Sequence, residues 1–278
     1  MGRRFTSREA ESLTRPARRD IVTGMTPPRF SLFAVPAPPP VDSSPAAAQG
    51  PGDVELWLCT LDELLTQRSE LEALLDADER ARCARLVREA DRVRYACFHG
   101  AVRRILAGPL AADPAALSFV RGPQGKPALG GSAADAGLAF NLSHSGDRLA
   151  LACGRGVELG VDVEAGDPRT DVVALAARFY HPRERDRLAG LPEAAQRAQF
   201  LRWWTAREAW VKARGLGLFD ELDALDFSAW TDGPWRGLAD EGGARWLAWS
   251  FGPAADWAGT LVMGPAARRI SRRAWPPA

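Results

Sequence analysis

The sequence has few of the features that would place it in a membrane or an oxidising compartment. No apolar run in its 278 residues approaches the roughly 18–20 residues that a transmembrane helix requires. The four cysteines, Cys59, Cys83, Cys97 and Cys153, lie far apart and form no C-x-x-C pair. We therefore expect a reduced, cytoplasmic protein with incidental thiols and no membrane segment.

Charge of one sign is not in excess either. The formal net charge is +1 at pH 7, and acidic residues are interspersed among the many arginines. Such a balance creates no global field that would attract nucleic acid or an anionic membrane. An arginine-rich RNA-associating protein with a disordered arm is an alternative, but the charge balance and the lack of aromatic–basic interleaving argue against it.

The order of the residues divides the chain into four expected regions. Residues 1–52, rich in proline, alanine and arginine, carry too little periodic apolar sequence to offset the entropy of ordering, so we expect disorder there. Residues 53–155 and 156–266 each run from strand to helices to further strands, which predicts an α+β fold of two similar α/β subdomains. Residues 267–278 are interpreted as a basic tail.

Local patterns predict most of the individual elements. Alternation of apolar and polar residues predicts strands, and apolar residues three and four apart predict helices. We expect strands at 53–59, 117–120, 138–142, 148–153, 157–164, 245–251 and 257–263. We expect helices at 63–75, 171–179, 182–188 and 194–213, and one long helix or a helix pair at 76–107.

Two carboxylates stand two residues apart on one of these expected strands. Within Gly160-Val-Asp-Val-Glu164, the side chains of Asp162 and Glu164 share a face, with Cα atoms about 6–7 Å apart. Oxygens placed in this way can converge on one hard cation while the two valines enter the core. A single D-x-E pair is also typical of an exposed polar strand face, so the pattern alone does not decide between the two.

A carboxylate and an ammonium lie one turn apart on the strongest helix candidate. In Trp204-Thr-Ala-Arg-Glu-Ala-Trp-Val-Lys212, the face of Glu208 and Lys212 is largely apolar, and the opposite side carries Trp203 and Trp210. An exposed pair at this spacing would contribute only roughly 0.3–0.5 kcal/mol. Charges that apolar neighbours bury need partners, so we expect a central helix whose Glu208 and Lys212 belong to a polar site.

Polar residues elsewhere are candidates for holding an anion. Asn141-Leu-Ser-His-Ser145 ends an expected strand and contains one of the three histidines. Adjacent strand residues face opposite ways, so His144 is poorly placed to activate Ser143, and anion binding is favoured over acyl transfer. Lys126, on a Gly/Pro turn without the spacing of a nucleoside-triphosphatase loop, can meet a phosphate as a point charge.

In their joint order and spacing, these motifs resemble the 4′-phosphopantetheinyl transferases, and more narrowly the pseudo-dimeric Sfp type. The resemblance covers roughly residues 53–220. The segments that carry it are Arg80/Arg82, Arg94, Gly125-Lys-Pro127, Phe140-Asn-Leu-Ser-His-Ser145, Gly160-Val-Asp-Val-Glu164 and Trp204-Thr-Ala-Arg-Glu-Ala-Trp-Val-Lys212.

The resemblance implies a fold, a reaction and a set of site residues. The enzyme would move the 4′-phosphopantetheine arm of coenzyme A to a serine of acyl or peptidyl carrier proteins for polyketide, nonribosomal peptide or fatty acid synthesis. Adenosine 3′,5′-bisphosphate would be released, with coenzyme A held between the two halves and Mg²⁺ as cofactor. By motif, the Mg²⁺ ligands would be Asp162, Glu164 and Glu208, the catalytic residues Glu208 and Lys212, and the coenzyme A contacts Arg80, Arg82, Arg94, Lys126, Ser143, His144 and Lys212.

Several further expectations accompany the resemblance. Glu208 is the candidate base for the carrier serine, directly or through a metal-bound water. Carrier domains are usually acidic, so we expect a basic and partly apolar rim around Arg169–Arg187. We expect a monomer, because both halves belong to one chain, and no nucleic-acid partner. The chain departs from the family at Arg207, where lysine is common, and a Mg²⁺-dependent phosphodiesterase that releases phosphopantetheine to water remains an alternative.

Overall fold

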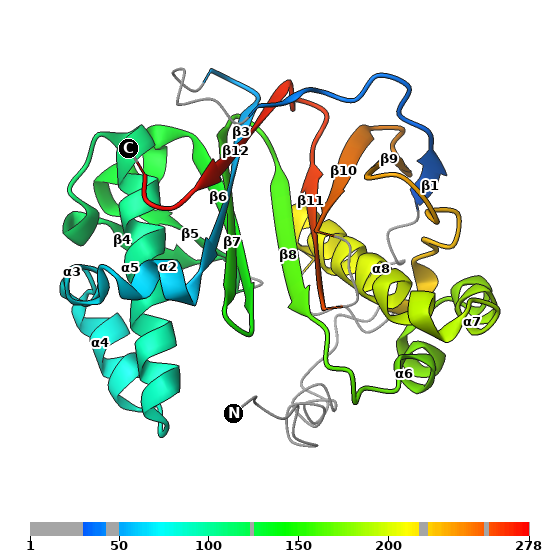
Figure 1. Ribbon diagram of the computed structural model, residues 1–278. Helices are drawn as coiled ribbons and strands as arrows, with labels where there is room; N and C mark the ends of the chain where they lie inside the picture. The colour runs from blue at the N-terminus through cyan, green and yellow to red at the C-terminus, as the bar shows by residue number, and fades with distance from the viewer. Residues whose placement is uncertain (1–29, 43–49, 123–124, 217–221, 253–255, 278) are drawn as a thin grey trace, which may run out of the picture.

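Two five-stranded sheets form the framework of the molecule, and helices cover the faces that the sheets turn away from each other (Figure 1). The computed structural model describes residues 30–42, 50–122, 125–216, 222–252 and 256–277. The amino-half sheet has the order β2 (Val41–Asp42), β12 (Arg269–Ala274), β3 (Asp53–Thr60), β7 (Arg148–Arg155), β6 (Leu138–Ser145). The carboxy-half sheet has the order β1 (Phe30–Phe33), β9 (Trp235–Asp240), β10 (Arg245–Phe251), β11 (Trp257–Met263), β8 (Leu159–Ala165).

Three apolar cores follow from the alternation along these strands. In β3, Trp57 and Cys59 face the amino-half helices, while Val54 and Leu56 face the other sheet. Val161 of β8 enters the same core between the sheets. Each sheet is therefore covered on both faces, once by its helices and once by the other sheet. The expected α+β fold of two α/β halves is confirmed.

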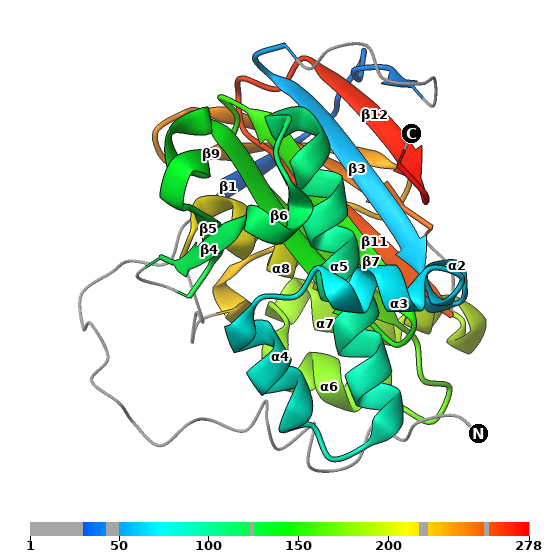
Figure 2. The ribbon, with the colours of Figure 1, turned by 90° about the vertical axis from the view of Figure 1, so that its left-hand side faces the viewer.

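Helices α2 (Leu61–Leu65), α3 (Arg68–Ala73), α4 (Ala77–Ala84) and α5 (Glu89–Leu110) cover the outer face of the amino-half sheet, with α3 and α4 packed against α5 (Figure 2). Thr60 and Asp76 cap α2 and α4, and in each case a glutamate three residues later bonds back to the cap. The helix expected at 63–75 is broken in two, and the region 76–107 forms a helix pair, one of the two alternatives predicted for it. Pro109 is tolerated inside α5, because a proline in the last turn forfeits only one intrahelical bond.

Helices α6 (Val172–Phe179), α7 (Pro182–Ala189) and α8 (Glu193–Arg214) cover the carboxy-half sheet. The prediction that α8 is central is confirmed, since Trp203 and Trp210 are fully buried. Gly215, in the left-handed conformation with a φ of 63°, ends the helix. Among the described residues, no helix has both the length and the apolar character needed to cross a bilayer.

Both ends of the described chain differ from expectation. The expected disorder of residues 1–52 is wrong for residues 30–42, where β1 pairs with β9 and β2 pairs with β12. Phe30 packs on the rings of Trp210 and Phe227, with ring centroids 5.3 and 4.7 Å apart. The rest of that region lies outside the described residues, apart from 50–52.

The expected basic tail is also wrong in part, because residues 269–274 form β12 beside β3. Arg269 and Arg273 are anchored there by Asp53 and Glu55, at 2.9 and 3.3 Å. The first described strand thus joins the carboxy-half sheet, and the last joins the amino-half sheet. The limits 53–155 and 156–266 stay a prediction as domain boundaries.

Two further strands lie in segments for which no strand was predicted. Pro127–Gly130 forms β5, which pairs with β4 (Ser118–Arg121), and Trp235–Asp240 forms β9. Proline is tolerated at the first position of β5. By contrast, β10 and β11 begin and end at the predicted residues.

Candidate active site

The two halves meet along β6 and β8, each an edge strand of its own sheet. No ladder of main-chain bonds joins these two strands; alternate side chains of β6 bridge the seam to β8 instead. The four bonds are Val161 N to Asn141 Oδ1 (2.8 Å), Ser143 Oγ to Asp162 Oδ1 (2.8 Å), Ser145 Oγ to Glu164 Oε2 (2.6 Å) and Ala165 N to Ser145 Oγ (3.0 Å). Both acids of β8 are therefore held by hydroxyl groups of the opposite half.

Asp162 lies at the centre of this seam and is only 3% exposed. Its Oδ1 accepts hydrogen bonds from Lys212 Nζ at 2.7 Å and from Ser143 Oγ. Its Oδ2 is buried and has no hydrogen-bond partner. A buried carboxylate oxygen without a donor is costly, so this atom is suited to a cationic ligand.

Glu164 and Glu208 share this neighbourhood with Asp162. Burial, reinforced by the charge of Asp162, raises the pKa of each glutamate to about 7. Burial acts to lower the pKa of Lys212, but the surrounding carboxylates outweigh it and raise that pKa. We call Asp162, Glu164 and Glu208 the seam acids. The structure brings them together with Lys212, although β8 and α8 are far apart in sequence.

The residues fit a divalent cation by their chemistry and by the free Oδ2. Oxygen-only ligands with surplus negative charge suit Mg²⁺, which also retains waters. As they stand, however, no three His, Cys, Asp or Glu side chains in the described part of the chain converge closely enough to hold a metal ion. Ligation of Mg²⁺ by the seam acids therefore stays a prediction.

Lys126 reaches the same region from the start of β5. Its Nζ donates to Leu159 O at 3.0 Å and to Lys212 O at 2.9 Å. Burial, together with the charge of Lys212, lowers its pKa, against an opposing effect of Glu158. The ammonium thus ties the amino half to β8 and to the carboxyl end of α8, where the helix dipole favours a cation. Its contact with a coenzyme A phosphate stays a prediction.

His144 and the predicted arginines lie on the amino-half side of the seam. The centroid of the His144 ring lies 5.6 Å from that of Phe98. Burial lowers the pKa of His144, and the nearby positive groups of His99, Arg94 and Lys212 lower it further. Arg94 is engaged by two aspartates, and Arg80 bonds to a main-chain carbonyl of the preceding turn. Arg82 is exposed, and its side chain has no hydrogen bond or ion pair within the described residues.

Sequence reasoning missed the residues beside Arg82. Tyr95 and His99, one turn apart on α5, stack with ring centroids 3.9 Å apart, and Tyr95 Oη is buried without a partner. His99 Nδ1 lies 3.1 Å from Glu79, which also accepts from the fully buried Arg103 at 2.6 Å. The only sequence signal for this pair was the spacing of two aromatic residues four apart on a predicted basic helix.

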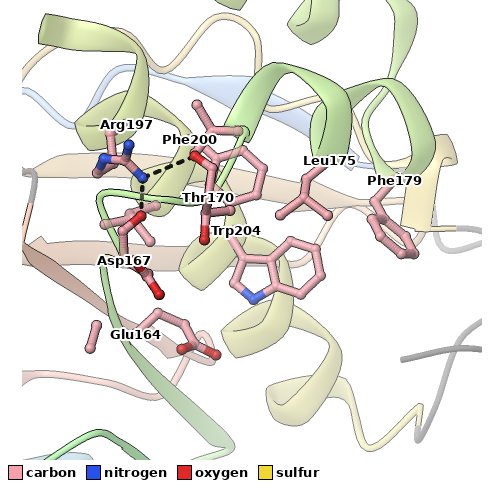
Figure 3. A pocket seen from close by; sticks show the side chains of 11 residues that line it. Glu164, Asp167, Thr170, Leu175, Phe179, Arg197, Phe200 and Trp204 are labelled. Carbon is pink, nitrogen blue, oxygen red and sulfur yellow. Dashed lines mark hydrogen bonds between the residues drawn. The ribbon is translucent and has the colours of Figure 1, made fainter. Parts of the chain in front are cut away.

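An apolar cavity of about 90 Å³ opens beside Glu164 (Figure 3). Leu175 and Phe179 of α6 and Trp204 of α8 line one end, and Glu164 lies at the other. Arg197 holds the wall by donating to the main-chain oxygens of residues 167 and 170. The cavity therefore leads from Glu164 into the carboxy half.

Arg207 does not belong to this site. Its guanidinium is completely buried on the other side of α8, where it donates to Glu184 at 2.5 Å and to Leu225 O at 3.0 Å. It stacks over the Tyr180 ring at 4.4 Å. The residue that departs from the family pattern is thus part of the core.

Comparison with known proteins agrees with this arrangement. The sequence model described as the 4′-phosphopantetheinyl transferase superfamily matches residues 158–262, and the model of the 4′-phosphopantetheinyl transferase N-terminal region matches residues 57–155. The two matches correspond to the two halves of the fold and define the class of protein: a transferase with both regions in one chain.

Named relatives identify the family. The chain is 39% identical over 166 residues to 4′-phosphopantetheinyl transferase HetI of Nostoc, covering 60% of this chain and 70% of the relative. It is 35% identical over 171 residues to a putative 4′-phosphopantetheinyl transferase of Synechocystis (62% and 68%), and 29% identical over 167 residues to a 4′-phosphopantetheinyl transferase of Bacillus subtilis (60% and 72%). The chain belongs to the 4′-phosphopantetheinyl transferase superfamily, as its motifs predicted. It is a transferase of this class, with coenzyme A as its co-substrate and carrier-protein domains as its acceptors.

Proposed function

We propose that this chain transfers the 4′-phosphopantetheine arm of coenzyme A to a carrier serine at the β6–β8 seam, with Mg²⁺ bound by the seam acids. The observation that carries the proposal is that Asp162 bonds to Lys212 through one carboxylate oxygen, lies close enough to Glu208 to raise its pKa, and keeps its other oxygen buried without a partner. The acids and the lysine come from β8 and α8 and lie at the boundary between the two halves. Such a set of groups can bind a pyrophosphate together with its cation.

The seam residues have separable roles in the reaction. When bound, Mg²⁺ would neutralise charge on the pyrophosphate oxygens of coenzyme A. Lys212, kept protonated by its acidic neighbours, would stabilise the charge that develops on the leaving phosphate. A pKa of about 7 suits Glu208 to accept a proton near neutral pH.

The transfer balances with these groups. The oxygen of the carrier serine bonds to the phosphorus that bears the pantetheine arm. The bond from that phosphorus to the bridging oxygen breaks, and adenosine 3′,5′-bisphosphate leaves with the electron pair. The serine proton passes to Glu208, directly or through water.

Coenzyme A would lie with its nucleotide end on the amino half and its arm in the carboxy half. Arg82, which has no internal partner, and His144 are available to the 3′-phosphate, with Arg80, Arg94, Lys126 and Ser143 nearby as further contacts. The stacked Tyr95 and His99 extend this surface with a flat ring. The cavity beside Glu164 is apolar enough for the pantetheine arm.

The carrier would dock on α6 and α7. Val173 is 38% exposed there, and the side chain of Arg183 is 78% exposed. An apolar contact surrounded by arginines is complementary to an acidic helical carrier. Arg187→Glu should raise the KM for the carrier about tenfold with the KM for coenzyme A unchanged, whereas Arg272→Glu on β12 should change neither. Equal effects of the two reversals would refute this docking face.

The test of the proposed function is intact-mass analysis of apo acyl or peptidyl carriers incubated with coenzyme A, Mg²⁺ and the full chain. The carrier should gain the mass of one phosphopantetheine group, and Asp162→Ala or Glu208→Ala should abolish the gain. Carriers of polyketide, nonribosomal peptide and fatty acid synthesis should be compared. Release of phosphopantetheine in reactions without a carrier would indicate a phosphodiesterase instead. We further propose that the chain acts as a monomer in the cytoplasm.

A further inference from the structure

The serines of β6 contact the two acids of β8 in the same manner. Each hydroxyl occupies one oxygen of one carboxylate: Ser143 bonds to Asp162 Oδ1, and Ser145 bonds to Glu164 Oε2. At Asp162 the second oxygen is left buried and without a partner. At Glu164 no other hydrogen bond is formed within the described residues. The serines thus fix the carboxylates and leave one oxygen of each uncommitted.

Ser145 is the more strictly oriented of the two hydroxyl groups. Its oxygen accepts a hydrogen bond from the main-chain N–H of Ala165 at 3.0 Å. Its proton is directed at Glu164, where the donor–acceptor distance is 2.6 Å. A hydroxyl that accepts from one strand atom and donates to the neighbouring side chain holds that side chain in one rotamer. Glutamate otherwise has several rotamers to lose when it binds a ligand.

We propose that Ser145 is a positioning residue for the cation, and that it pre-orders Glu164 for Mg²⁺ before any substrate binds. This inference rests on the proposed function, because it takes Glu164 to be a ligand. Groups that orient a ligating side chain typically alter metal affinity by about 10–100-fold when removed. We therefore expect loss of the Ser145 hydroxyl to weaken cation binding about tenfold.

Asn141 provides the matched control, because it bridges the same seam without touching an acid. Its Oδ1 accepts from the main-chain N–H of Val161 at 2.8 Å, and the residue is 4% exposed. Asn141→Ala removes a seam bond and should lower the melting temperature. If Ser145 acted only by holding the halves together, the Asn141 and Ser145 variants would weaken cation binding alike.

The experiment is a titration of the full chain with Mn²⁺, in place of Mg²⁺, followed by electron paramagnetic resonance without coenzyme A or carrier. Ser145→Ala should bind Mn²⁺ about tenfold more weakly than the wild type. Ser145→Thr, which keeps the hydroxyl, and Asn141→Ala should bind within about twofold of it. Circular dichroism melts of each variant report the loss of folding separately.

Four results would overturn the inference. Ser145→Ala could bind Mn²⁺ as the wild type does, Ser145→Thr could bind as weakly as Ser145→Ala, or Asn141→Ala could weaken binding to the same extent. A wild type that binds no Mn²⁺ would also refute it. In that last case, transfer in the mass assay would show that the transferase function stands and that only the cation assignment fails.

Discussion

Gly160→Ala should force apart the strand and the helix that carry the seam acids. An added Cβ would lie 2.3 Å from both Ala209 O and Ala213 N. These are main-chain atoms of α8, so no side-chain rotation can relieve the overlap. Ordinary contact begins at 3.4 Å, so α8 would have to move away from β8 by about 1 Å in a closely packed interior.

The size of the effect follows from this displacement. Overpacking in a core typically lowers the free energy of unfolding by about 1–3 kcal/mol. Because the clashing atoms here belong to the main chain and cannot rotate away, we expect a loss of about 3 kcal/mol for Gly160→Ala. For a chain of this length, that lowers the melting temperature by about 6–12 °C. A misplacement of about 1 Å between Asp162 on β8 and Glu208 on α8 should reduce kcat about 100-fold.

Two other glycines separate this effect from a general loss of stability. At Gly100, an added Cβ would lie 2.4 Å from Leu71 O, a similar clash within the amino half. At Gly108 it would meet nothing within 4 Å. Calorimetric melts and carrier-modification kinetics should show that Gly100→Ala loses stability but keeps most of its kcat below the melting transition. Gly108→Ala should lose neither, because alanine is favoured over glycine in a helix by roughly 0.5–1 kcal/mol.

The reasoning is refuted if Gly160→Ala melts and turns over like the wild type. It also fails if Gly100→Ala loses as much kcat as Gly160→Ala at a temperature where both are folded, since the loss would then not depend on the β8–α8 contact.

Three further outcomes are expected. Hydrogen bonds from His99 and Arg103 hold the pKa of Glu79 at about 2 despite burial, below its ordinary value of 4.5. The ionised carboxylate therefore stabilises the folded state above pH 4.5. This stabilisation is lost as the pH falls towards 2. Glu79→Gln should destabilise the protein by about 2 kcal/mol at pH 7 and flatten that acid slope in urea titrations; an unchanged slope would contradict the assignment. Arg207→Lys should lower the free energy of unfolding, measured in urea, by about 2 kcal/mol. An ammonium cannot reproduce the several N–H donors by which the guanidinium binds Glu184 and two main-chain carbonyls. A variant as stable as the wild type would show that these hydrogen bonds are dispensable. The seam glutamates have a pKa raised to about 7, so protons compete with a cation below that pH, and Mg²⁺ should raise the melting temperature more at pH 8 than at pH 6. An equal rise at both pH values would indicate that these glutamates do not bind it.

Several elements were predictable because their signals are local. Alternation in Gly160–Glu164 placed both acids on one face of β8, and the four-residue spacing of Glu208 and Lys212 placed them one turn apart on α8. The apolar surroundings of that pair also predicted a buried helix. In each case, the residues that encode the feature lie within a few positions of one another.

Other features depended on partners far away in the sequence. Residues 30–33 lie in a region whose overall composition predicted disorder, yet β1 forms because β9 offers an open edge and Phe30 packs against Trp210. The basic residues 269–274 become β12 because β3 supplies a free edge and acidic partners. No window of the sequence contains both sides of such a pairing.

The sequence by itself determined the family, the two α/β halves and the residue types that carry the chemistry, because these reside in local periodicity and in the order of the motifs. Only the tertiary structure decided which partner each polar group takes. Lys126 donates to two main-chain carbonyls, Ser145 bonds to Glu164, and Arg207 enters the core. A buried polar group bonds to whatever the fold brings within about 3 Å, and that neighbour is set by the packing of the whole chain.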